Sequence, residues 1–123
     1  MKISEGLTRI PRLIFELADT LEILDLSANS ISSLPDDFAR LSKLQVLFLS
    51  DNDFTVFPEV LARCPNLTMI SFKANEITRI PERALPKQTR WLILTDNQLT
   101  CLPDSIGGLA DLQKLMLAGN ELL

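Results

Sequence analysis

Several residue types on which common protein functions depend are missing or scarce in this sequence. Its 123 residues include no histidine, no tyrosine and only two cysteines. Without an imidazole the chain cannot form a triad of the serine-protease type, and most zinc sites lose their usual ligand. The chain also has no glycine-rich phosphate loop, no metal-ligand spacing and no kinase signature. The sequence therefore predicts no enzymatic activity, no metal site and no bound cofactor.

Long apolar stretches and basic runs are lacking as well. No apolar run approaches the length of about 18 to 20 residues that a membrane-spanning helix needs. The 12 basic and 16 acidic residues give a net charge of −4, and no basic run marks a nucleic acid site. Two cysteines are too few for a disulfide framework, and residues 1–6 lack the apolar core of a secretory signal. We expect one cytoplasmic domain that binds neither membranes nor nucleic acid.

The strongest signal present is an internal repeat. A nine-residue block at residues 21–29 recurs at 44–52, 67–75, 89–97 and 112–120. Each block ends in asparagine, and successive asparagines are 23, 23, 22 and 23 residues apart. A second element, apolar-x-x-apolar-Pro, follows four of the blocks. The whole unit, L-x-x-L-x-L-x-x-N followed by x-φ-x-x-L-P with φ apolar, is identified as the pattern of the leucine-rich repeat family.

The repeat predicts the fold class. Within each block, leucines and other apolar residues alternate with period two, which indicates a short strand with those side chains inward. Prolines 35, 58, 81 and 103 suit the first turn of a short helix or 3-10 segment. We expect an α/β solenoid with a parallel concave sheet of about five strands and helical or 3-10 segments on the convex side. The single domain, 1–123, would comprise a partial repeat, 1–20, and five repeats, 21–123, the last incomplete.

The recurring asparagines come just after each predicted strand, where the chain turns and backbone groups would be buried without partners. An amide side chain donates and accepts hydrogen bonds at once, so the asparagines are predicted to form a structural ladder. Its members are Asn29, Asn52, Asn75, Asn97 and Asn120.

The residues between the inward leucines must point out of the sheet. One row has Ile23, Val46, Met69, Trp91 and Lys114, and the next has Asp25, Phe48, Ser71, Ile93 and Met116. We expect these side chains to be exposed and to bind a partner, together with Lys73 at the edge, because contiguous apolar patches commonly mark interfaces. The alternative is that β-branched and aromatic residues simply suit strands. Charge also passes from Glu22 and Asp25 to Lys73, Arg90 and Lys114, which could orient a ligand acidic at one end.

Other candidate residues have a simpler interpretation. Cys64 occupies a core leucine position, whereas Cys101 lies in a more exposed turn, so a disulfide between them is not expected. Asp51 and Asp96 share a position after the second and fourth strands. Two strand spacings separate them by roughly 10 Å, and we interpret both as solvated turn residues. The fourth repeat is one residue short, with Thr89 in a leucine position, and an irregular convex segment is expected around residues 85–89.

The period of 23 with Leu-Pro at the turn resembles intracellular bacterial and plant repeat proteins. Residues 16–26, 90–97 and 112–120 resemble the N-terminal repeat region of bacterial leucine-rich-repeat protein kinases, in which a kinase domain follows. The leading hypothesis is a non-catalytic protein-interaction scaffold that binds a protein or peptide on its concave face. One alternative is a regulatory or sensor fragment of a larger signalling protein such as a kinase. Another is self-association through the uncapped C-terminal end.

Overall fold

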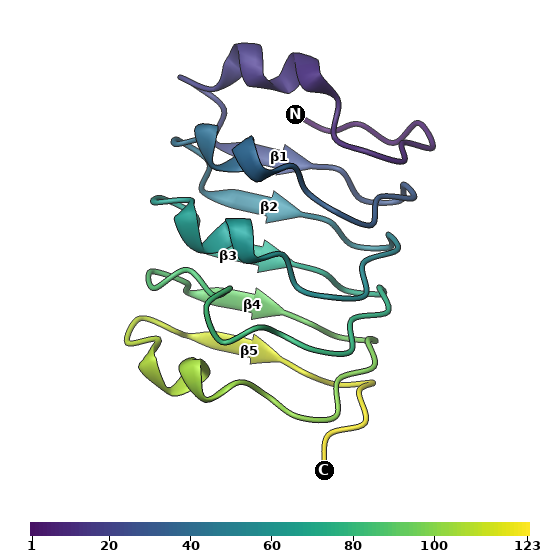
Figure 1. The fold of residues 1–123 in the computed structure, drawn as a ribbon, viewed down its shortest axis with the longest axis vertical. Coiled ribbons are helices and arrows are strands. Elements are labelled where there is room, and N and C mark those ends of the chain that lie inside the picture. Colours follow the sequence, from purple (N-terminus) through teal and green to yellow (C-terminus); the bar gives the residue numbers. More distant parts are fainter.

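Five short parallel strands form a single sheet in the computed structural model of this chain, which describes residues 1–123 (Figure 1). The strands are hydrogen-bonded in sequence order, and residues one repeat apart lie opposite each other, as in the pair Leu24 and Leu47. The strands are β1 (Ile23–Asp25), β2 (Val46–Phe48), β3 (Met69–Ser71), β4 (Trp91–Ile93) and β5 (Lys114–Met116). The predicted concave parallel sheet is confirmed. In the partial repeat before these strands, a single bridge, between Lys2 and Asp25, adds to the edge of β1.

Four 3-10 helices return the chain over the convex side, in front of the strands in Figure 1. They are η1 (Arg12–Leu17), η2 (Asp36–Arg40), η3 (Glu59–Arg63) and η4 (Asp104–Gly108). A proline stands immediately before each helix with φ between −65° and −70°. Since that angle already suits a helical turn and the first helical N–H groups need no partner within the helix, proline favours these starts.

The convex segment between β3 and β4 contains turns and no helix, which confirms the irregularity expected around residues 85–89. Thr89 fills the leucine position while fully buried, and its hydroxyl donates to the carbonyl of Pro86 at 2.6 Å. The Gln88 amide donates to the carbonyls of Cys64 and Leu67 at 2.7 and 2.9 Å. Side-chain hydrogen bonds thus join this shorter segment to the repeat before it.

The core lies between the sheet and the convex segments, and the inward side chains of the strands form its centre. In β1, Leu24 and the following Leu26 are fully buried, and the same holds for the equivalent pairs of the next three repeats. Burying one leucine contributes about 1.5–3 kcal/mol, so this stack is the main source of stability. In the outermost repeat Leu115 and Leu117 are half-buried. No helix of the structure is both long and apolar enough to cross a bilayer.

Candidate functional site

The ladder asparagines follow the carboxyl ends of the strands, and each one forms hydrogen bonds with backbone groups of two repeats. The Asn52 amide nitrogen donates to the carbonyls of Leu26 and Leu49 at 3.0 and 3.2 Å, and its oxygen accepts the N–H of Ile31 at 3.0 Å. Asn75 and Asn97 repeat this arrangement, as does the half-buried Asn120. Buried peptide groups without partners cost roughly 1–3 kcal/mol each, so these side chains hold the repeats together.

The residue before each ladder asparagine adopts a left-handed backbone conformation that sequence reasoning missed. Its φ lies between 55° and 60° in four repeats and is 77° at Gly119. The four non-glycine members are Ala28, Asp51, Ala74 and Asp96. The signal for it was Gly119, because glycine is the usual residue where φ is positive. Asp51 and Asp96 are exposed at this turn, as the sequence indicated.

Seven apolar side chains project from the concave face of the sheet, and we call them the concave patch. Ile23 and Met116 at the two ends are 52% and 42% exposed, and the other five are half-buried because each packs beside its neighbours. The strand register places every member opposite the equivalent residue of the adjacent strand. The patch consists of Ile23, Val46, Phe48, Met69, Trp91, Ile93 and Met116.

Ser71 interrupts the patch, and its expected exposure is wrong. Its side chain lies in the same row as Phe48 and Ile93, directly between them in the register, but only 3% of the residue is exposed. A short hydroxymethyl group does not reach past two large neighbours. Its oxygen is 2.8 Å from the hydroxyl of Ser50, so the buried group has a hydrogen-bond partner.

The basic side chains predicted to bind a partner lie at two edges of the patch. Lys114 is exposed, and its ammonium nitrogen lies 4.4 Å from the centre of the Trp91 ring. Lys73 is exposed after the carboxyl end of β3. At the other ends of β3, β4 and β5 a hollow of about 270 Å³ is lined by Thr68, Met69, Arg90, Trp91 and Gln113.

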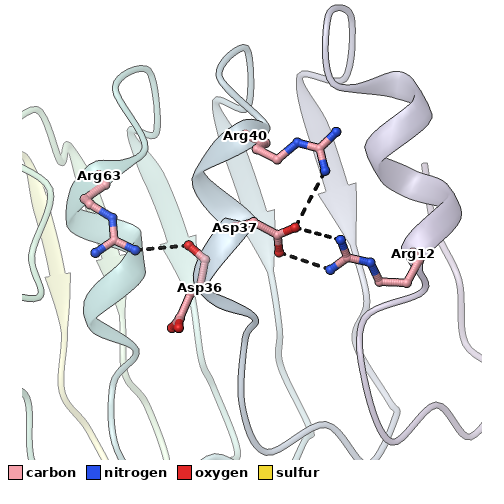
Figure 2. A network of polar contacts seen from close by, with 5 residues as sticks. All are labelled: Arg12, Asp36, Asp37, Arg40 and Arg63. Carbon is pink, nitrogen blue, oxygen red and sulfur yellow. Dashed lines mark hydrogen bonds and ion pairs between the residues drawn. The ribbon is translucent and has the colours of Figure 1, made fainter.

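A second polar cluster lies on the convex side and was not foreseen (Figure 2). Arg12 of η1 donates two hydrogen bonds to the Asp37 carboxylate of η2, at 3.0 and 2.6 Å, and Arg40 lies 3.6 Å from the same group. The hydrogen bonds from Arg12 lower the pKa of Asp37 below its ordinary value. Both guanidinium groups also lie over the Phe15 ring, 4.4 and 5.1 Å from its centre. This cluster joins η1 to η2 and has no reactive group beyond these ion pairs.

The two thiols occupy different environments. Cys64 is fully buried in the core, and burial raises its pKa to about 11, so it is a thiol at neutral pH. Cys101 is exposed, and neither cysteine forms a disulfide. No group of three or more carboxylate or thiol side chains is placed to hold a metal ion.

Comparisons with known proteins agree with the geometry. The family model described as "Leucine rich repeat" matches residues 4–54 and 65–122. Among solved structures, a leucine-rich repeat protein of Leptospira interrogans is similar over 94% of this chain, with 30% identity and a TM-score of 0.79. An internalin from Listeria monocytogenes is similar over 99%, with 25% identity and a TM-score of 0.70. This chain spans only 36% and 34% of their lengths. The curated proteins include no significant match.

Proposed function

Because the chain belongs to the leucine-rich repeat family, we propose that it is a non-catalytic interaction module whose concave patch binds a protein or peptide. Leucine-rich repeat domains generally act as protein-interaction scaffolds. The proposal specifies the surface on which this chain binds its partner. It also assigns no catalysis to the site, because the chain has no histidine and the patch consists of apolar side chains alone.

The observation that carries the proposal is that the patch has at least one apolar member on each of the five strands, with Met69 alone joining the two sides across β3. Strand propensity explains why such residues occur in β-strands, but a solvent-facing row tolerates polar residues equally well. Contiguous apolar surface on a soluble protein commonly marks an interface, and a half-exposed tryptophan such as Trp91 is a typical interface anchor. Phe48 is the other aromatic member of the patch, two strands away.

A pair of double variants tests the proposal. The variant with Phe48→Ala and Trp91→Ala removes both aromatic side chains of the patch. The control has Leu13→Ala and Leu17→Ala, which removes two exposed apolar side chains from η1 on the convex side. We expect only the first variant to lose capture of partners from the source cell, with the melting temperature of both close to that of the parent. Unaltered capture by the first variant would exclude the patch.

The cellular setting is part of the proposal. The period of 23 and the two unpaired cysteines favour the intracellular type of repeat protein, a cytoplasmic location and one domain over residues 1–123. The net charge of −4 favours a protein partner over nucleic acid or a membrane. Fractionation of the source cell, with thiol alkylation during lysis, checks this directly. The protein should be found in the cytoplasmic fraction with both thiols alkylated.

A second candidate function is a regulatory or sensor arm of a larger signalling protein such as a bacterial protein kinase. Its support is that the chain spans about a third of the solved proteins it resembles. Reading the parent reading frame beyond Leu123 decides it, and a stop codon at that point contradicts it. Self-association through the half-buried leucines of the last repeat is a further candidate. Light scattering over a dilution series tests it, and a strictly monomeric chain would exclude it.

A further inference from the structure

Exposed basic side chains gather at the end of the concave patch that β3, β4 and β5 form. At the opposite end, Asp25 of the first repeat pairs with Lys2 in the sheet, and the Met1 ammonium donates to the carbonyl of Ile23 at 3.1 Å. Three basic side chains belong to later repeats, and all are exposed. None of these three forms an ion pair, since the only ion pairs of the structure join Asp37 to Arg12 and Arg40. The basic group comprises Lys73, Arg90 and Lys114.

Two of these cations lie next to the aromatic anchor. Arg90 and Trp91 both line the hollow at the start of β4, and Lys114 holds its ammonium group against the Trp91 ring. The hollow, about 270 Å³, is several times the roughly 30 Å³ that one water molecule occupies, so it has room for a side chain. Asp111 lines an adjoining hollow with Arg90 but does not pair with it. A ligand in this hollow can therefore contact the Trp91 ring and the two cations at the same time.

Building on the proposed function of the patch, we propose that the partner contributes a short acidic segment with an apolar side chain. Its carboxylates bind Arg90 and Lys114, and the apolar side chain enters the hollow beside Trp91. Arginine pairs with carboxylates through two parallel hydrogen bonds, which fixes the orientation of such a segment. The segment lies over β4 and β5, where these two cations are.

The charge of the whole chain favours a short acidic peptide over a nucleic acid strand. The net charge is −4, and exposed Asp96 and Asp111 lie in the same two repeats as Arg90 and Lys114. A nucleic acid strand needs several successive phosphate contacts to bind, whereas a short peptide can place its carboxylates at the two cations alone.

Trp91 is the only tryptophan, and the chain has no tyrosine, so intrinsic fluorescence reports on this site alone. The experiment selects binders from a library of random peptides displayed on phage, then titrates the synthetic peptides while Trp91 emission is followed. The test variant has Arg90→Glu and Lys114→Glu. The control has Lys43→Glu and Lys87→Glu, exposed cations outside the concave face, and changes the net charge equally.

We expect the selected peptides to be enriched in aspartate and glutamate next to leucine or an aromatic residue. Reversing Arg90 and Lys114 should weaken their binding about tenfold or more, while the control keeps it within about twofold. Peptides that alter Trp91 emission but carry no acidic residues would overturn the acidic segment and leave the proposed function standing. Tighter binding of single-stranded oligothymidylate than of any selected peptide would also overturn it. If no peptide or partner alters Trp91 emission, the proposed function fails as well.

Discussion

The ammonium nitrogen of Lys114 lies 4.4 Å from the centre of the Trp91 ring, although the two residues are 23 positions apart in the chain. They are direct partners in the register of β4 and β5, so the repeat period itself brings them together. A cation over an indole ring at an exposed site contributes roughly 0.5–1 kcal/mol. The contact therefore fixes the position of a positive charge at the edge of the concave patch.

The ladder asparagines should contribute unequally to stability, according to their burial. Asn52→Ala leaves the buried N–H of Ile31 without its partner and removes one of the two asparagine donors from each of the carbonyls of Leu26 and Leu49. We expect this to lower the free energy of unfolding by about 3 kcal/mol. Asn120→Ala is the matched control at a half-buried position, where water can replace the amide, with an expected loss of about 1 kcal/mol. Urea denaturation measures both, and equal losses would contradict the assigned role.

Ala74 has a left-handed backbone, with φ at 59°. An L-residue in that conformation is strained by roughly 1–2 kcal/mol, whereas glycine adopts it freely. We expect Ala74→Gly to raise the free energy of unfolding by about 0.5–1 kcal/mol after the larger entropy of the unfolded glycine chain is subtracted. Ala62→Gly in η3 is the control, and it should lower stability by a similar amount. Destabilisation of both variants in urea would show that the left-handed turn is not strained.

The ion pair between Arg12 and Asp37 predicts a pH dependence. The hydrogen bonds from Arg12 lower the pKa of Asp37 in the folded protein, relative to about 3.9 in an unfolded chain. The resulting stabilisation is present above pH 4, roughly, and is lost as the pH falls through the lowered folded pKa. In Arg12→Gln the pKa of Asp37 should return toward its ordinary value, as followed by NMR titration. Arg9→Gln, an exposed arginine without an ion pair, is the control and should leave the Asp37 titration unchanged.

The two cysteines should differ in reactivity toward a thiol reagent. Cys64 is buried, and its pKa of about 11 leaves about a thousandth of it as thiolate at pH 8. We expect the folded protein to release one equivalent of chromophore rapidly from a disulfide reagent, through Cys101, and two equivalents in denaturant. Cys101→Ser should abolish the rapid phase. A rapid phase that persisted in Cys101→Ser would contradict the burial of Cys64.

Much of this fold could be predicted from the sequence because every repeat has the same pattern of inward apolar residues. Leu24, Leu47 and Ile70 take inward positions in successive strands, so one register error would expose the whole stack. Prolines before the convex turns and asparagines after the strands mark the remaining boundaries. The sheet and its order follow from these positions, since each repeat buries its apolar face only against its neighbours.

The features that sequence reasoning missed depend on contacts between side chains of different repeats. Arg12 reaches Asp37, 25 positions away rather than 23, so the pair falls outside the repeat register. Ser71 is buried by the length of its neighbours, which no periodicity records. Gln88 donates to two carbonyls of the preceding repeat where the fourth repeat is short. In each case the cause is local packing rather than pattern.

Site-directed photo-crosslinking tests most directly whether the concave patch is the binding surface. A benzophenone-bearing residue replaces Ile23, which is 52% exposed on the concave face, or Leu13, which is 58% exposed on η1 of the convex side. Irradiation in the source cell should join the same partner to the Ile23 derivative and not to the Leu13 derivative. Equal crosslinking from both positions, or crosslinking from Leu13 alone, would contradict binding on the concave face.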